Sequence, residues 1–117
     1  MKIRISDDVV VLELAGELDI ATTPPVLDLL TAALVETPAR TAVFDLRDVT
    51  FMDSSAIKCL IYAHNRIRVR EGHVIVCNAR PHVAKVIRIL GLDRDIELHE
   101  QKAPSLGAAR GSVLSAS

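Results

Sequence analysis

The sequence predicts an α/β fold in which helices pack against a mixed, largely parallel sheet of four to five strands. Apolar runs rich in valine and isoleucine alternate along the chain with runs whose apolar residues recur at helical spacing. Strands that alternate with helices need crossover connections, which favour parallel pairing. The 117 residues contain no internal repeat, so we expect one core.

The first half of the chain predicts a hairpin, a helix and a third strand. Ile3–Ser6 and Val9–Leu14 flank a pair of aspartates, and the second strand should be buried. A helix is expected from about Pro24 to Glu36, with Thr22 or Thr23 as a candidate cap. Thr41–Leu46 predicts a short strand.

The second half predicts two further helices and two strands. A helix should run from Ser55 to about Val69, with one apolar face and one basic face. His73–Cys77 predicts a buried strand, and a helix beginning at Pro81 should follow it. Asp95–Leu98 predicts a short edge strand.

Composition defines the domain and excludes several partners. We expect a domain over residues 1–102 and a flexible tail over residues 103–117, where Ala, Ser, Gly and Pro dominate. Fourteen basic against fifteen acidic residues give no electrostatic basis for direct nucleic-acid binding. No apolar run is long enough for membrane insertion, and the N-terminus lacks the apolar core of a signal peptide, so we expect a cytoplasmic protein.

The segment Asp53-Ser54-Ser55 joins a strand pattern to a helix pattern. Free N–H groups at a helix N-terminus favour an anion or a phosphate there. One interpretation is that Asp53 or Ser54 is only the N-cap of the helix. The other is that Ser55 is a regulatory phosphoacceptor, where a phosphate adds about −1.5 to −2 charges. The helix dipole would favour that charge and Asp53 would oppose it, which predicts a change of surface rather than of fold.

Catalytic and metal-binding interpretations find little support in the spacing of the reactive residues. A serine nucleophile needs a base, yet His64 is more than two helical turns from Ser55. The pair Asp7-Asp8 precedes its strand, so it would lie at the wrong end for a magnesium-dependent phosphoaspartate site. No histidine or cysteine pair has metal-ligand spacing, and the two cysteines predict small buried side chains rather than a disulfide. We therefore expect no catalytic residue, no metal and no cofactor.

Two further segments are candidates for a partner surface. Gly16–Asp19 follows the second strand at the edge where the carboxyl ends of the strands lie, although alone it is a generic turn. The basic helix face is by default solvated, but it could pair with an acidic partner. Its members are Lys58, Arg66, Arg68 and Arg70.

Three motifs together resemble a known family. Gly-Glu-Leu-Asp follows an early strand, Asp-Leu-x-x-Val-x-Phe-Met-Asp-Ser-Ser precedes a helix, and Val-Ile-Val-Cys-Asn-Ala-Arg-Pro continues the pattern. From about Ile3 to His99 the chain is similar to the STAS domain of bacterial anti-sigma factor antagonists. The resemblance implies a STAS-like fold for the whole domain.

The resemblance also implies a phospho-switched binding module that is not an enzyme. Such an antagonist binds an anti-sigma factor serine kinase and so releases a sigma factor. The kinase, which carries ATP and magnesium, phosphorylates the second serine, here Ser55, and the phosphorylated form dissociates. A metal-dependent serine phosphatase restores the free hydroxyl. The residues expected to contribute to the partner surface are Gly16, Glu17, Asp19, Asp53, Ser54, Ala56 and Lys58.

This chain departs from the family pattern directly after the two serines. The family commonly has Gly-Leu-Gly, whereas this chain has Ala56-Ile57-Lys58. The two larger side chains predict a different choice of partner, because they occupy positions that a kinase would approach. Two alternatives use the same surface: an accessory subunit of a lipid ABC transporter, and a scaffold or sensor subunit of a signalling assembly.

Overall fold

The computed structural model describes residues 1–101 as one sheet with one layer of helices. The predicted tail, residues 103–117, lies outside the described residues. The elements in chain order are β1 (Lys2–Ser6), β2 (Val9–Leu18), α1 (Thr23–Glu36), β3 (Thr41–Met52), α2 (Ser54–Arg68), β4 (His73–Ala79), α3 (Pro81–Ile89), the short 3-10 helix η1 (Leu92–Arg94) and β5 (Glu97–Glu100).

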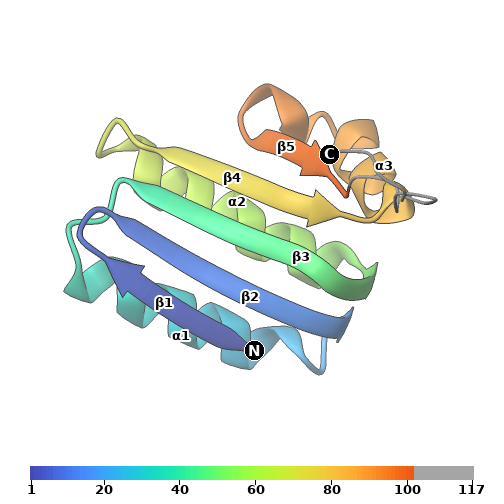
Figure 1. Cartoon of the computed structure of the whole chain (residues 1–117), viewed down its shortest axis with the longest axis horizontal. Coiled ribbons are helices and arrows are strands. Elements are labelled where there is room, and N and C mark those ends of the chain that lie inside the picture. The colour runs from blue at the N-terminus through green and yellow to red at the C-terminus, as the bar shows by residue number, and fades with distance from the viewer. Residues whose placement is uncertain (102–117) are drawn as a thin grey trace, which may run out of the picture.

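The five strands form one mixed sheet in the order β1-β2-β3-β4-β5, the same as their order in the sequence (Figure 1). β1 pairs antiparallel with β2, and the other three pairings are parallel. The predicted mixed, largely parallel sheet is therefore confirmed, with five strands.

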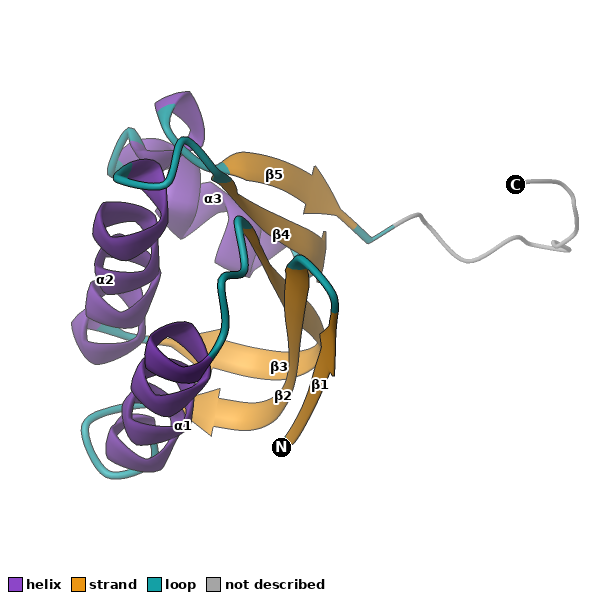
Figure 2. Ribbon diagram, turned by 90° about the vertical axis from the view of Figure 1, so that its left-hand side faces the viewer, coloured by secondary structure: helices purple, strands orange, loops and turns teal. Residues whose placement is uncertain are grey.

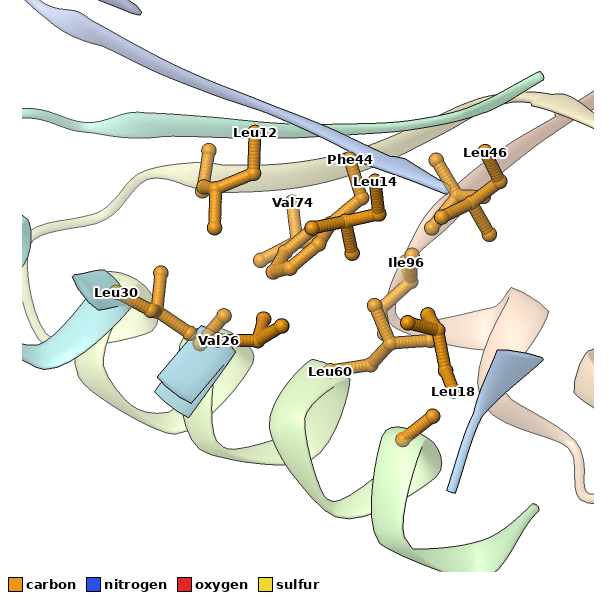
Figure 3. Close-up of a cluster of buried hydrophobic side chains, with 14 of the residues drawn as sticks. Leu12, Leu14, Leu18, Val26, Leu30, Phe44, Leu46, Leu60, Val74 and Ile96 are labelled. Atoms are coloured by element: carbon orange, nitrogen blue, oxygen red, sulfur yellow. The ribbon is translucent and has the colours of Figure 1, made fainter. Parts of the chain in front are cut away.

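All three helices lie on one face of the sheet (Figure 2). Alternate residues of the central strands point to that face and form the core with the apolar sides of the helices. Figure 3 shows Phe44, Leu12 and Val74 from the strands above Leu30 and Leu60 from the helices. Aliphatic side chains dominate the core, as the low aromatic content of 3% requires.

Two strands exceed their predicted length by four residues or more. β2 continues past Leu14 to Leu18, and β3 continues past Leu46 to Met52. The period of two breaks in this region because the register between the strands shifts twice, before Ala15 and after Gly16. Gly16 has φ of +78°, a conformation that glycine adopts without strain. Gly16–Leu18 is therefore an irregular strand end rather than the turn we expected.

Smaller differences concern helix ends and the last strand. Thr22 makes no side-chain cap for α1, because its hydroxyl donates to Glu17 O at 2.7 Å instead. β5 begins at Glu97, two residues later than predicted, because the amides of Asp95 and Ile96 bond to Leu92 O and extend the turn of η1.

The start of β4 is packed tightly against the loop that precedes β3. A Cβ built on Gly72 would lie 1.9 Å from Arg40 O, so no larger residue fits there without movement of the backbone. The next residue, His73, donates its amide to the same Arg40 O at 2.8 Å. Gly72 thus allows the close approach that starts the β3–β4 pairing.

Candidate functional site

The N-terminus of α2 is capped by Asp53. This residue has extended backbone angles, and its Oδ1 accepts the amide of Ser55 at 2.8 Å. Ser54 is the first helical residue, one position earlier than predicted, and it is exposed, whereas Ser55 is half-buried. The two interpretations of this segment are therefore compatible, because Asp53 caps the helix and leaves the Ser55 hydroxyl available.

The end of β2 is joined to this cap. The amide of Asp53 donates to Leu18 O at 3.0 Å, so two of the predicted surface segments meet at the carboxyl edge of the sheet. Glu17 pairs with Phe51 in the sheet and is exposed with it. Asp19, which directly follows Leu18, is therefore close to Asp53, while Gly16 and Glu17 lie earlier along the strand.

Asp19 holds the loop between β2 and α1 in a tight turn. Its Oδ1 accepts the amides of Ala21 at 2.9 Å and Thr22 at 3.0 Å, and the Asp19 amide donates to the Thr22 hydroxyl at 2.9 Å. The amide of Thr22, followed by the amide of Ala21, lowers the pKa of the Asp19 carboxyl below its usual value. This exposed loop is therefore fixed by its own charge-assisted hydrogen bonds.

A groove of about 230 Å³ separates the N-terminal parts of α1 and α2. Its lining is mostly apolar, and Ile20 beside it is 78% exposed. Ser55 and Lys58 both border the groove, as residues three apart on a helix can. The full set of lining residues is Ile20, Thr23, Pro24, Leu27, Asp28, Ser55, Lys58 and Cys59.

The two positions that depart from the family pattern have different environments. Lys58 is exposed at the groove, as expected of a residue that contacts a partner. Ala56 is only 3% exposed and packs in the core, so its assignment to the partner surface was wrong. The first helical turn points this methyl group at the sheet, where it adds apolar contact. Of the two departures, only Lys58 changes the surface.

Arg70 was predicted to be part of a basic helix face, but it has a different role. Its Nη1 donates to Thr37 O at 3.1 Å and to Ala39 O at 2.8 Å, and its Nη2 donates to Leu34 O. The guanidinium thereby satisfies carbonyl groups at and after the C-terminus of α1.

The other reactive side chains do not converge on the serines. Among the described residues, no histidine hydrogen-bonds Ser54 or Ser55; His82, for instance, bonds Thr50 O at 2.6 Å. Residues 1–101 also contain no group of three or more His, Cys, Asp or Glu side chains that could hold a metal ion. Within residues 1–101 the arrangement therefore has a candidate acceptor hydroxyl with no histidine bonded to it.

Both cysteines are free thiols, as predicted. Cys59 is buried beneath the groove, and this burial raises the pKa of its thiol to about 11. Cys77 is only half-buried on the opposite face of the sheet, and burial raises the pKa of its thiol as well.

The sequence interpretation missed the apolar groove walls. Ile20 and Leu27 belong to a turn and to a helix, and their proximity to Ser55 depends on how α1 packs on α2. A large aliphatic residue directly after Gly-Glu-Leu-Asp was the available signal, because turns seldom expose such a side chain. None of the helices in residues 1–101 is long and apolar enough to cross a membrane.

The fold agrees with that of known proteins that this chain matches. The STAS domain model matches residues 1–104, so the chain belongs to the STAS domain family. The anti-sigma F factor antagonist of Paenibacillus polymyxa is 26% identical over 98 residues, which cover 84% of each chain.

Solved structures show the same fold. The anti-sigma factor antagonist SpoIIAA in its unphosphorylated form has a TM-score of 0.75 and 24% identity, covering 97% of this chain and 98% of that one. The Bacillus cell fate determinant SpoIIAA in the phosphorylated form has a TM-score of 0.69 and 21% identity, covering 93% and 96%.

Proposed function

We propose that this protein is an anti-sigma factor antagonist that binds an anti-sigma factor serine kinase and so releases a sigma factor. Phosphorylation of Ser55 ends the binding. The observation that carries the proposal is the position of Ser55, half-buried at the N-terminus of α2 and on the border of an apolar groove. The family and the antagonist relatives support it.

The groove explains why one phosphate is enough to release a partner. A partner that covers the groove would bury apolar surface from α1 and α2 and remove water from around Ser55. A phosphate of about −1.5 to −2 charges at that point would have to lose its hydration, which costs more than the contact gains. Release therefore follows from desolvation of charge at the interface.

The fold should tolerate the modification. The bond from Ser55 to Asp53 uses the backbone amide, so a phosphate on the hydroxyl leaves the cap in place. The helix dipole favours the phosphate, Asp53 opposes it, and Lys58 at the groove offers a positive charge on the same helix face. The switch therefore acts on the surface of a folded domain.

In this role the chain is a ligand and a substrate rather than an enzyme. The kinase supplies ATP and magnesium, and a serine phosphatase acting on the phosphorylated form restores binding. The chain itself needs no cofactor. Its partner surface consists of the groove, the Asp19 turn, Asp53, Ser54 and Lys58.

The test is phosphorylation by the anti-sigma factor kinase encoded in the same genome. Incubation with ATP should add one phosphate, and peptide mass spectrometry should locate it on Ser55. Ser55→Ala should abolish the addition, while Ser54→Ala, the matched control one residue away, should retain it. A phosphate on Ser54, or undiminished labelling of Ser55→Ala, would contradict the assignment.

A further inference from the structure

No helix or strand of residues 1–101 covers the face of the sheet opposite the helices. In Figure 2 the three helices lie on one side of the strands, and no described helix lies on the other. Parallel strands are usually covered on both faces, because their connections place helices on both sides. This face is nevertheless apolar at its centre. An apolar patch on a protein surface is typical of an interaction site.

One cross-strand row shows how this open face is organised. The pairings place Arg4, Val11, Val43, Ile75 and Glu97 side by side, one from each strand. The three central side chains are aliphatic and half-buried, while Arg4 and Glu97 at the two edges are exposed. The row is therefore positive at the β1 edge, apolar in the middle and negative at the β5 edge.

A surface with this pattern is complementary to itself. We propose that the open face binds a second copy of this chain, with a twofold axis that lies between the sheets, parallel to the strands and over β3. This operation places β1 over β5 of the other copy and β2 over its β4. Arg4 then faces Glu97 of the second copy, and Val11 faces its Ile75.

The charge pair can form only between molecules. Arg4 and Glu97 are separated by four strand spacings, about 19 Å, on the same face. In their own chain they have other partners: Arg4 lies 3.0 Å from Glu13, and Glu97 lies 2.5 Å from His99. Any energetic coupling between residues 4 and 97 therefore reports contact between two copies.

The next row sets a limit on the strength of the dimer. Asp45 follows Val43 on the open face of β3, so the two Asp45 carboxylates lie near each other across the axis. Each also accepts hydrogen bonds of 3.0 Å from Asn78 and from the amide of Arg47. The like charges oppose association, and the row offers only three half-buried aliphatic side chains for apolar contact. We expect a weak, reversible dimer.

The proposal does not depend on the proposed function. Ser55 and its groove lie in the helix layer, and the dimer uses the opposite face. Phosphorylation of Ser55 can therefore fail while dimerisation succeeds, and the reverse.

The experiment combines sedimentation velocity and amide NMR on the full chain over a range of concentrations. A weak dimer should be dissociated at about 20 μM and populated at about 1 mM. Concentration should shift signals of Val11, Val43 and Ile75 and leave those of α1 unchanged. Glu97→Lys should weaken the dimer about tenfold, because the twofold axis creates two repulsive contacts. Glu36→Lys on α1 makes the same charge change and should have no effect.

Two further variants test the orientation. Adding Arg4→Glu to Glu97→Lys should restore most of the affinity, and Asp45→Asn should strengthen the dimer. Thermal unfolding at low concentration checks that each variant folds. The proposal is overturned if the wild type is monomeric at about 1 mM or if the charge swap gives no recovery of affinity. It is also overturned if the NMR signals of the open face do not change with concentration. That result is expected if the chain's own C-terminal segment covers this face.

Discussion

The Oδ1 atom of Asp53 lies 2.8 Å from the backbone nitrogen of Ser55, so the residue that caps α2 also orients the proposed phosphoacceptor. Asp53→Ala removes this bond and should lower the free energy of unfolding by about 1 kcal/mol. Asp53→Asn keeps an acceptor oxygen and should cost less. Urea unfolding measures both. Equal losses for the two variants would show that the charge matters and the hydrogen bond does not.

A negative charge at residue 55 should interact with Lys58, three residues along the same helix face. In Ser55→Asp the pair should stabilise the helix by about 0.3 kcal/mol. A double-mutant cycle with Lys58→Met, measured by thermal unfolding at low and high salt, isolates this term. Salt should reduce it. A coupling that is zero at low salt would exclude Lys58 as a neighbour of the phosphate.

The turn at Asp19 should have its own pH dependence. The pKa of the Asp19 carboxyl is lowered in the native state from the ordinary 3.8, so folding favours the charged form of this carboxyl. The resulting stabilisation is complete above the unfolded pKa and declines as the pH falls through the lower native pKa. Asp19→Asn keeps the turn-forming amide oxygen but cannot titrate.

The wild-type protein should therefore lose stability on acidification relative to Asp19→Asn. Thermal unfolding from about pH 6 to about pH 2.5 measures the difference, and a carboxyl NMR titration measures the pKa directly. Asp28→Asn, on the other border of the groove, is a suitable control. Parallel curves for wild type and Asp19→Asn would refute the prediction.

Gly72 should tolerate substitution much less than Gly16. In Gly72→Ala the methyl group would overlap Arg40 O, at the bond that starts the β3–β4 pairing, and should cost about 3 kcal/mol or more. Gly16→Ala has open space around the new Cβ and only a strained φ, so about 1 kcal/mol is expected. Chemical unfolding of the two variants compares them. A reversed order would show that backbone strain outweighs the clash.

Periodicity was sufficient to predict the sheet and the helices, because each apolar stripe needs a single buried face. Periodicity failed where the register between β2 and β3 shifts around Gly16. The pairing of these strands beyond that point, as far as Met52, was therefore not predicted. Capping chemistry, which is local in the sequence, limited the N-cap of α2 to Asp53 or Ser54, and the structure has Asp53 there.

Features that depend on packing between distant segments were outside the reach of the sequence. The groove beside Ser55 needs α1 and α2 to lie together, and Arg70 reaches carbonyl groups more than thirty residues earlier in the chain. Ala56 is a different case, because its helical spacing with Leu60, Ala63 and Ile67 predicts burial, and only the family resemblance assigned it to the partner surface.

The strand order β1-β2-β3-β4-β5 also bears on how the protein is made. Each strand leaving the ribosome finds its neighbour already synthesised, and the sheet extends along one edge in the direction of translation. No later strand has to be inserted between two earlier ones, which keeps the sequence separation of paired residues short and favours fast folding. The exposed edge of β3 is covered only when β4 emerges, so this interval is when a nascent chain is most open to pairing with another.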